Sequence, residues 1–249
     1  MALLLCNDDG IDASGLRALE EGLKDMAPLF VVAPNKERSA QSHALTMHKP
    51  LFARPRGEGR WAVSGTPADC VYIALHGLLD APPALVVSGI NRGANLGYDV
   101  HYSGTVAGAR EAVLHGVPGL SVSLCIYERG TAHWESAAFY ARRVASNILE
   151  HGLPIGVHLN LNVPNLPLSE IKGLRTAVMG ERRYAHEVDT RTDPRGRSYH
   201  WIGGPPERHE GSVEEDGPAI DAGWATVTPL TIRPTAVHAL DHTRGWTDA

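Results

Sequence analysis

Two adjacent carboxylates, Asp8 and Asp9, follow a short apolar run at residues 3–6. Asn7 and Gly10 flank the pair, and both are turn formers, so the strand predicted for the apolar run should end here. Adjacent residues inside a strand point to opposite faces, whereas residues just beyond its end can face one ligand together. Paired carboxylates repel each other unless a cation lies between them or one of them holds a proton. The pair therefore indicates either a divalent-metal site or an exposed turn that caps a helix, and these residues alone leave both open.

Two side chains with neutral oxygens, Ser39 and Asn91, are expected at the same edge of the sheet. Ser39 lies in a long polar loop, residues 34–49, and Asn91 lies in a glycine- and asparagine-rich segment, residues 89–97. A loop of that length in a compact domain is usually functional or disordered. With the two aspartates they form an all-oxygen set, which suits Mg²⁺, Mn²⁺ or Ca²⁺, whereas structural zinc prefers cysteine or histidine. Each also has a simpler explanation, Ser39 as a solvated loop residue and Asn91 as a turn residue.

Asn95 and the run of Ser103, Gly104 and Thr105 could bind a phosphate. The run stands at the predicted start of a helix, where free backbone N–H groups and the positive end of the helix dipole favour an anion. Such a run is also a common helix cap, and Asn95 could occupy a left-handed turn position. A cation held by two carboxylates beside a phosphate cradle suffices for phosphoester hydrolysis, because the metal polarises the phosphoryl oxygen and lowers the pKa of a bound water. The joint placement of these residues on one sheet edge favours a metal-dependent phosphatase over a set of caps and turns.

His43 is a candidate for proton transfer because it shares the polar loop with Ser39. Asp9 could take the proton instead, and the sequence leaves that choice open. The thirteen histidines are otherwise scattered, without the spacing expected of metal ligands on one helix. The chain contains no G-x-x-x-x-G-K-[ST] sequence, which removes the usual ATPase template.

The elements that must position these residues alternate between strands and helices. Residues 3–6 and 29–33 are predicted to form buried strands, and the helix between them, which Ser14 can cap, repeats leucines three and four positions apart. A strand–helix–strand unit of about 30 residues implies a parallel sheet with a right-handed crossover. Further strands are predicted at residues 61–64, 84–88, 120–124 and 157–163, and further helices after Thr66, after Ser103 and over 133–150, the last with Phe139, Val144 and Ile148 on its inner side. The pattern predicts an α/β fold with a mostly parallel sheet, whose carboxyl edge gathers ligands.

The sequence divides into two parts near residue 168. Residues 1–168 carry all the candidate site residues, and we expect them to form the metal- and phosphate-binding core. Residues 169–249 are rich in charge, glycine and proline, with short β-like pieces. They predict a smaller β-rich appendage whose hairpins reach toward a second subunit, with a late strand at about 224–230 that returns to the core.

The composition of the 249-residue chain limits its partners and its location. A formal net charge of −5 gives no electrostatic reason to bind a nucleic-acid polymer or a membrane surface. No apolar run approaches the ~18 residues that a membrane span needs, and no basic-then-apolar leader precedes the first strand, so we expect a cytoplasmic protein. The three cysteines lie in or beside apolar segments, which predicts buried thiols.

Five segments resemble, in order and spacing, the SurE family of survival nucleotidases: LCNDDGIDASGLRAL, VVAPNKERSAQSHALTM, VSGTPADCV, VSGINRGANLGYDVHYSGTVAGAREA and ATVTPL. The resemblance implies a three-layer αβα Rossmann-like core and an oligomerising C-terminal part that makes a homodimer or homotetramer. It also implies hydrolysis of nucleoside 5′-monophosphates with one divalent metal ion per subunit, Mg²⁺ or Mn²⁺. Carried over to this chain, it implies Asp8, Asp9, Ser39 and Asn91 as metal ligands, and Asn95, Ser103, Gly104 and Thr105 around the phosphate.

Two other functions stay open. A haloacid-dehalogenase-type phosphatase with an aspartyl nucleophile would also place a carboxylate at the end of its first strand, although it needs Asp-x-Asp and the aspartates here are adjacent. A non-catalytic nucleotide-sensing module would bind the same ligands without releasing phosphate, and the intact set of oxygen ligands argues against it. Side activity on 3′-nucleotides or polyphosphate is left open as well.

Overall fold

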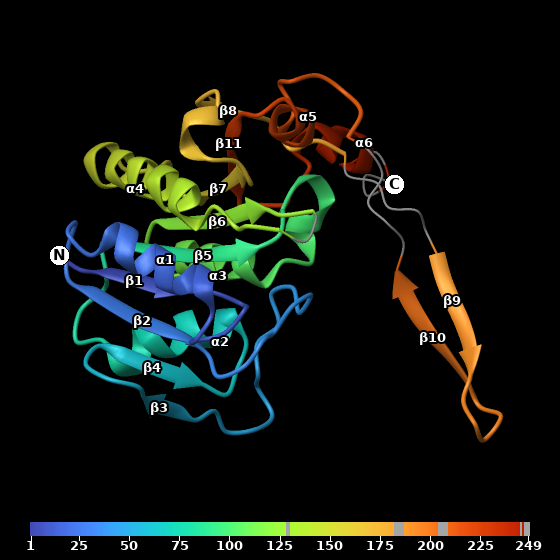
Figure 1. Ribbon diagram of the computed structural model, residues 1–249, viewed down its shortest axis with the longest axis horizontal. Helices are drawn as coiled ribbons and strands as arrows, with labels where there is room; N and C mark the ends of the chain where they lie inside the picture. The colour runs from blue at the N-terminus through green and yellow to red at the C-terminus, as the bar shows by residue number, and fades with distance from the viewer. Residues whose placement is uncertain (128–129, 182–186, 204–208, 245, 247–249) are drawn as a thin grey trace.

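The computed structural model describes residues 1–127, 130–181, 187–203, 209–244 and 246 (Figure 1). Its centre is a nine-stranded sheet in the order β3-β4-β2-β1-β5-β6-β7-β11-β8, with helices on both faces. The sheet strands are β1 (Leu3–Cys6), β2 (Leu29–Pro34), β3 (Ala53–Pro55), β4 (Arg60–Val63), β5 (Leu85–Arg92), β6 (Gly119–Cys125), β7 (Val157–Pro164), β8 (Leu174–Thr176) and β11 (Ala225–Thr231). The helices that cover it are α1 (Ser14–Leu23), α2 (Pro67–Ile73), α3 (Gly104–Leu114), α4 (Trp134–His151) and α5 (Asp216–Asp221). This arrangement confirms the predicted α/β fold with a mostly parallel sheet.

β1 lies at the centre of the sheet because its side chains are apolar toward both faces. All residues of Leu3–Cys6 have 0% exposed surface. The strand pairs in parallel with β2 on one side and β5 on the other. The carboxyl ends of three parallel strands therefore meet where Asp8 and Asp9 follow β1.

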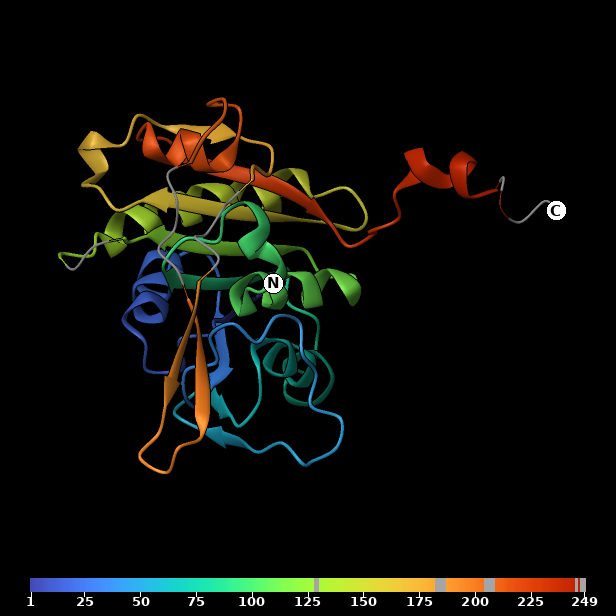
Figure 2. The same ribbon diagram turned by 90° about the vertical axis from the view of Figure 1, so that its right-hand side faces the viewer.

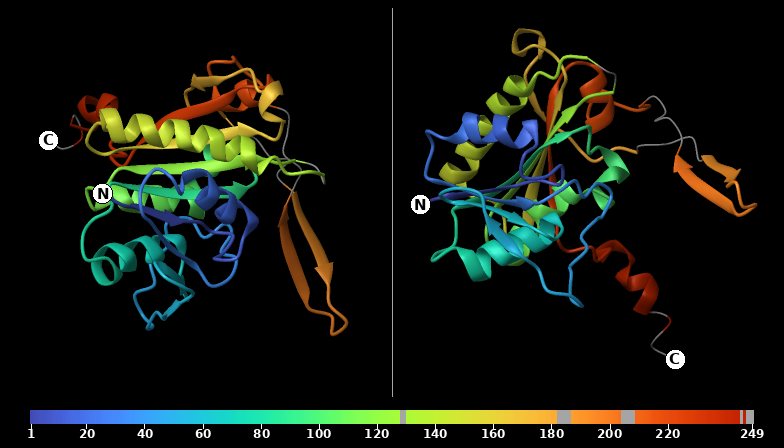
Figure 3. Two further views of the ribbon diagram at one scale, coloured as in Figure 1. Left: turned by 60° about the vertical axis from the view of Figure 1, so that its left-hand side comes forward. Right: turned by 60° about the horizontal axis from the view of Figure 1, so that its bottom comes forward.

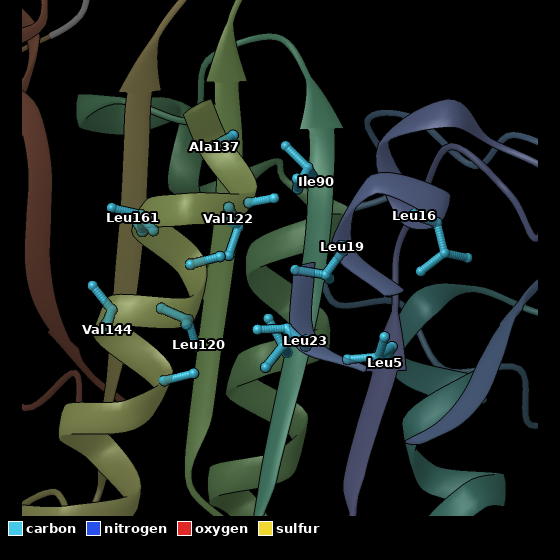
Figure 4. Packing of buried hydrophobic residues seen from close by; sticks show 14 of the residues in the cluster. Leu5, Leu16, Leu19, Leu23, Ile90, Leu120, Val122, Ala137, Val144 and Leu161 are labelled. Carbon is cyan, nitrogen blue, oxygen red and sulfur yellow. The ribbon is translucent and has the colours of Figure 1, made fainter. Parts of the chain in front are cut away.

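The two faces of β1 belong to two separate hydrophobic cores. Leu3 and Leu5 pack with residues of α1 and α4, whereas Leu4 and Cys6 pack with residues of α2 and α3. Figure 4 shows the first of these cores, with the leucines of α1 lying over the sheet. All three cysteines are free and buried, as the sequence predicts.

Two helix predictions are wrong in detail. Phe139 of α4 is 48% exposed, because it lies about half a turn around the helix from Val144 and Ile148, which are buried as predicted. Ser14 does not cap α1. Ala13 occupies the N-cap position instead, and no side chain caps the helix.

The C-terminal part both extends the sheet and projects away from it. β11 pairs antiparallel with β7, and β8 pairs in parallel with β11, so the late strand lies in the central sheet. The antiparallel hairpin of β9 (Glu187–Thr192) and β10 (Ser198–Gly203) projects from the body of the molecule (Figure 1). The last helix, α6 (Leu240–Arg244), extends in a different direction (Figure 2 and Figure 3). Within the described ranges, no helix combines the length and apolar character needed to span a bilayer.

A buried carboxylate joins the segment before the hairpin to the carboxyl edge of the sheet. Asp216, at the start of α5, is 1% exposed. Its Oδ2 accepts the backbone N–H of Gly97 at 2.9 Å, and its Oδ1 accepts that of Gly180 at 3.0 Å. Gly97 opens a short helix, η2 (Gly97–His101), that leads into α3. One side chain therefore ties the C-terminal part to the segment that precedes α3.

Candidate active site

The carboxyl ends of β1, β2 and β5 open into a pocket of about 420 Å³. Its lining includes most of the residues predicted from the sequence, namely Asp8, Asp9, Ser39, Asn91, Asn95 and Ser103. Gly104 and Thr105 lie directly against Asp8. The structure thus brings the predicted metal ligands and phosphate-binding residues to one place.

Asp8 is a buried carboxylate, with only 5% of its surface exposed. The pKa of Asp8 is raised to about 6. Burial is the main cause, the hydrogen bond donated by the Thr105 hydroxyl opposes the shift, and repulsion from Asp9 adds to it. The backbone carbonyl of Asp8 accepts the N–H of Arg38 at 2.8 Å, which ties the loop after β2 to the end of β1. Asp8 is therefore held firmly in a position where its negative charge is poorly solvated.

Asp9 lies beside Asp8 and is less buried. Its Oδ2 accepts the backbone N–H of Arg92 at 3.1 Å. Burial raises the pKa of Asp9, the Arg92 hydrogen bond lowers it, and the nearby charge of Glu37 raises it again, with a net upward shift. Among the residues that the structure describes, no group of three His, Cys, Asp or Glu side chains is placed to hold a metal ion. A cation bound by the two aspartates must therefore take its other protein ligands from neutral oxygens.

Ser39 and Asn91 present such oxygens in the same pocket. Ser39 Oγ donates to Glu37 Oε1 at 2.8 Å, and a hydroxyl that donates still has lone pairs with which to bind a cation. The Asn91 Nδ2 donates to the carbonyl of Gly93 at 3.0 Å, so the Oδ1 is the atom of this amide left for a ligand. Both side chains can serve as neutral ligands.

An irregularity in the pairing of β5 with β6 places Asn91 at the edge of the sheet. The register of the two strands shifts between Ser88 and Asn91. Gly89 lies in this irregularity with a φ of +149°, and a Cβ there would lie 2.4 Å from the Val122 carbonyl oxygen. Only glycine fits this conformation and this close approach. Irregularities of this kind re-aim side chains next to active sites.

α3 begins in contact with Asp8. Ser103 is its N-cap, and the Ser103 Oγ accepts the backbone N–H of Val106 at 3.0 Å. A Cβ on Gly104 would lie 3.0 Å from the Cβ of Asp8, so the missing side chain lets the helix approach this closely. The Thr105 hydroxyl is directed to Asp8. The backbone N–H groups of the first turn of α3 therefore stand beside the carboxylate pair, where an anion can bind them.

Comparison with known proteins identifies the family of the chain. The family model described as Survival protein SurE matches residues 3–186. The chain belongs to the SurE family. A 5′-nucleotidase SurE from Moorella thermoacetica is 49% identical over 238 residues, which cover 92% of this chain and 90% of the relative. A 5′-nucleotidase SurE from Geotalea daltonii is 44% identical over 246 residues, 99% of each chain. The crystal structure of the SurE protein from Aquifex aeolicus matches 100% of both chains with a TM-score of 0.90 and 36% identity.

In this SurE chain His43 contacts α3 and is not part of the pocket lining. Its Nε2 lies 2.5 Å from Oε2 of Glu111, and Nε2 of His115 lies 3.0 Å from Oε1 of the same carboxylate. Burial would raise the pKa of Glu111, but the hydrogen bonds and charges of the two histidines outweigh it, and the net pKa lies below the usual value. His43 therefore anchors the Ser39 loop to α3. Its role in proton transfer stays a prediction.

The SurE pocket also contains residues that sequence reasoning missed, among them Glu37, Arg92 and Tyr102. Glu37 and Arg92 lie within two positions of the predicted ligands Ser39 and Asn91, so their sequence position was the available signal. Tyr102 is 68% exposed at the end of η2. Sequence offers no signal for that exposure, because it depends on how η2 meets the edge of the sheet.

Proposed function

We propose that the chain hydrolyses nucleoside 5′-monophosphates to nucleoside and phosphate, with a divalent metal ion held at the carboxyl edge of its sheet. The relatives named 5′-nucleotidase SurE, matched over nearly the whole chain, support this class of reaction. The observation that carries the site is the carboxylate pair. Asp8 and Asp9 both have raised pKa values and share one pocket with the start of α3.

The side chains fit a hard divalent cation. The ionised forms of Asp8 and Asp9 are disfavoured by burial, so a cation between them supplies the missing positive partner. Ser39 and Asn91 add neutral oxygens, which together with carboxylates suit Mg²⁺ or Mn²⁺. We assign one ion per subunit to these four residues, with coordination positions left for water and substrate.

The remaining residues bind and orient the phosphate. When bound, the ion supplies a water of lowered pKa and polarises the phosphoryl oxygen. Asn95 and the first backbone N–H groups of α3 bind the other phosphate oxygens. The Thr105 hydroxyl stabilises the ionised form of Asp8. Asp9 takes the proton of the attacking water, because it lines the pocket and His43 does not.

Phosphate recognition by a helix start and a metal ion does not read the base, so activity on 3′-nucleotides or polyphosphate is compatible with the same site. We place the reaction in the cytoplasm.

We also assign the hairpin of β9 and β10 to the interface of a homodimer or homotetramer, since its apolar side chains are exposed in the single chain.

The test is Asp8→Ala, assayed for phosphate release across a panel of nucleotides with Mg²⁺, Mn²⁺ and Co²⁺ added after chelation. We expect kcat to fall by about 10³-fold or more, since an electrostatic group at the reacting centre is removed. The matched control is Asp12→Ala, which makes the same change at a carboxylate that is 75% exposed and should keep the wild-type rate. Thermal melting of both variants establishes that they are folded.

A wild-type rate in folded, metal-replete Asp8→Ala protein would contradict the proposal. A rate of phosphate release that chelation does not change would contradict it too. Trapping of a phospho-aspartate on Asp8 would favour the haloacid-dehalogenase mechanism. Binding of nucleotide and metal with no phosphate release under any metal would favour a sensing module.

A further inference from the structure

The α3 face of β6 and β7 is polar although it is fully buried. Ser121 and Ser123 of β6 alternate with apolar residues that face α1 and α4, and Asn160 and Asn162 of β7 do the same. All four polar side chains have 0% exposed surface. They pair across the two strands, Ser121 opposite Asn160 and Ser123 opposite Asn162. Buried amides are costly unless they are hydrogen-bonded, so their partners indicate their purpose.

Two of these side chains hold the backbone of Asn95. The backbone N–H of Asn95 donates to Oδ1 of Asn162 at 2.9 Å. The backbone carbonyl of Asn95 accepts from Nδ2 of Asn162 at 3.0 Å and from Nδ2 of Asn160 at 2.8 Å. The Ser121 hydroxyl donates to Oδ1 of Asn160 at 2.8 Å, which orients that amide with its Nδ2 toward Asn95. Both backbone polar groups of Asn95 are thus held by rigid strands.

A fourth hydrogen bond fixes the side chain of Asn95. The Nδ2 of Asn95 donates to Oγ of Ser123 at 2.8 Å, while Asn95 is 6% exposed and lines the pocket. The Nδ2 of the Asn95 amide therefore binds Ser123, and its Oδ1 is left for the pocket. A phosphate would take the Nδ2 donor, and because a serine hydroxyl can donate as well as accept, the amide can turn over and keep its bond to Ser123.

The polar row continues onto β11 without reaching Asn95. Thr226 lies opposite Asn162 and Thr228 lies opposite Asn160. Both are buried, and their hydroxyls have no hydrogen-bond partner among the described residues. Within the described part of the chain, contact with Asn95 therefore distinguishes the β6 and β7 side chains from their β11 neighbours.

We propose that Ser123, Asn160 and Asn162 are positioning residues for phosphate hydrolysis, which fix Asn95 so that its amide meets the phosphoryl group. The inference rests on the proposed function and deepens it. The segment that carries Asn95 lies between Gly93 and Gly97, both with positive φ, so it has little stiffness of its own. A misplacement of about 1 Å in a group that binds the reacting phosphoryl can cost up to about 100-fold in rate.

The experiment compares Ser123→Ala with Ser123→Thr and with Thr226→Val. Ser123→Ala removes the hydrogen bond that restrains the Asn95 side chain and leaves the Asn95 backbone contacts, so we expect kcat to fall about tenfold or more. We expect inhibition by inorganic phosphate to weaken in parallel, with the metal dissociation constant and the melting temperature nearly unchanged. Ser123→Thr keeps a hydroxyl and should restore most of the rate. Thr226→Val deletes a buried hydroxyl on the same polar face and should leave both readouts at wild-type values.

A second variant guards against a folding defect at position 123. Asn160→Asp keeps the acceptor for Ser121 and replaces the Nδ2 donor with an oxygen that faces the Asn95 carbonyl, so it should weaken phosphate inhibition too. Wild-type kcat and phosphate inhibition in folded Ser123→Ala would overturn the inference. An equal loss in Thr226→Val, or a loss of metal affinity in place of phosphate affinity, would also overturn it. Failure of the wild-type protein to release phosphate is a separate result, which removes the proposed function itself.

Discussion

The central sheet and the hairpin of β9 and β10 use similar side chains in opposite ways. Leu3–Cys6 of β1 is wholly buried under helices on both faces. In the hairpin, Val188 is 62% exposed, Trp201 63% and Ile202 93%. Figure 1 shows that the hairpin stands clear of the sheet and its helices. The subunit therefore gains its stability in the sheet, and the apolar surface of the hairpin contributes little to folding of the single chain.

Leu5→Ala tests the sheet side of this comparison and has the largest expected effect. Leu5 is 0% exposed, and its truncation should lower the free energy of unfolding by about 3 kcal/mol or more. Urea unfolding measures the change. Ile155→Ala is the matched control, because Ile155 is 93% exposed and should lose less than about 0.5 kcal/mol. Equal losses in the two variants would contradict the burial that defines this core.

Asp8→Asn sharpens the comparison, because it should raise the stability of the same sheet at its carboxyl edge. The pKa of Asp8 is raised to about 6 in the folded chain from its ordinary value of 3.8, so folding favours its protonated form. The contribution of the Asp8 carboxyl to the free energy of unfolding is therefore fully present below pH 4 and is lost as the pH rises through 6. Above pH 6 the free energy of unfolding is lower by about 3 kcal/mol. The neutral amide should recover about 2 kcal/mol at pH 8 in metal-free protein while activity is lost. Urea unfolding at pH 5 and pH 8 checks this, and a variant that is less stable at both would refute it.

Trp201→Ser tests the hairpin side and has the smallest expected effect on folding. Trp201 is 63% exposed, so the unfolding free energy of the subunit should change by less than about 0.5 kcal/mol. If the hairpin forms the proposed interface, light scattering should show weakened assembly at unchanged subunit stability. A large loss of subunit stability with intact assembly would break the comparison between the two regions.

Much of the fold follows from local sequence patterns. The short apolar runs predicted as strands are strands, because a strand buried on both faces needs apolar side chains in both directions. Thr66 and Asp69 form a reciprocal capping box at the start of α2, where Thr66 and the proline after it predicted a helix start. Phe139 is hydrophobic, which predicts burial, but its angular position on α4 places it opposite the buried Val144 and Ile148.

The contacts within the site do not follow from local sequence patterns, because they join distant parts of the chain. The Thr105 hydroxyl reaches Asp8 across a separation of 97 residues, and His43 meets Glu111 across 68. The alternating asparagines of β7 predict a strand, but nothing local shows that they hold Asn95, 65 residues earlier for Asn160. Sequence patterns record which face a side chain occupies. The partner on that face depends on how the strands are ordered in the sheet.

Asp216 has a mechanical consequence. Because one buried carboxylate accepts N–H groups from both Gly97 and Gly180, neither segment can shift far without stretching a hydrogen bond to a charge. A pull on the chain near Gly180, where it leaves the body toward the hairpin, is transmitted through Asp216 to the segment that leads into α3. The central sheet and the hairpin differ in how they contribute to stability, but they are connected mechanically through the side chain of Asp216.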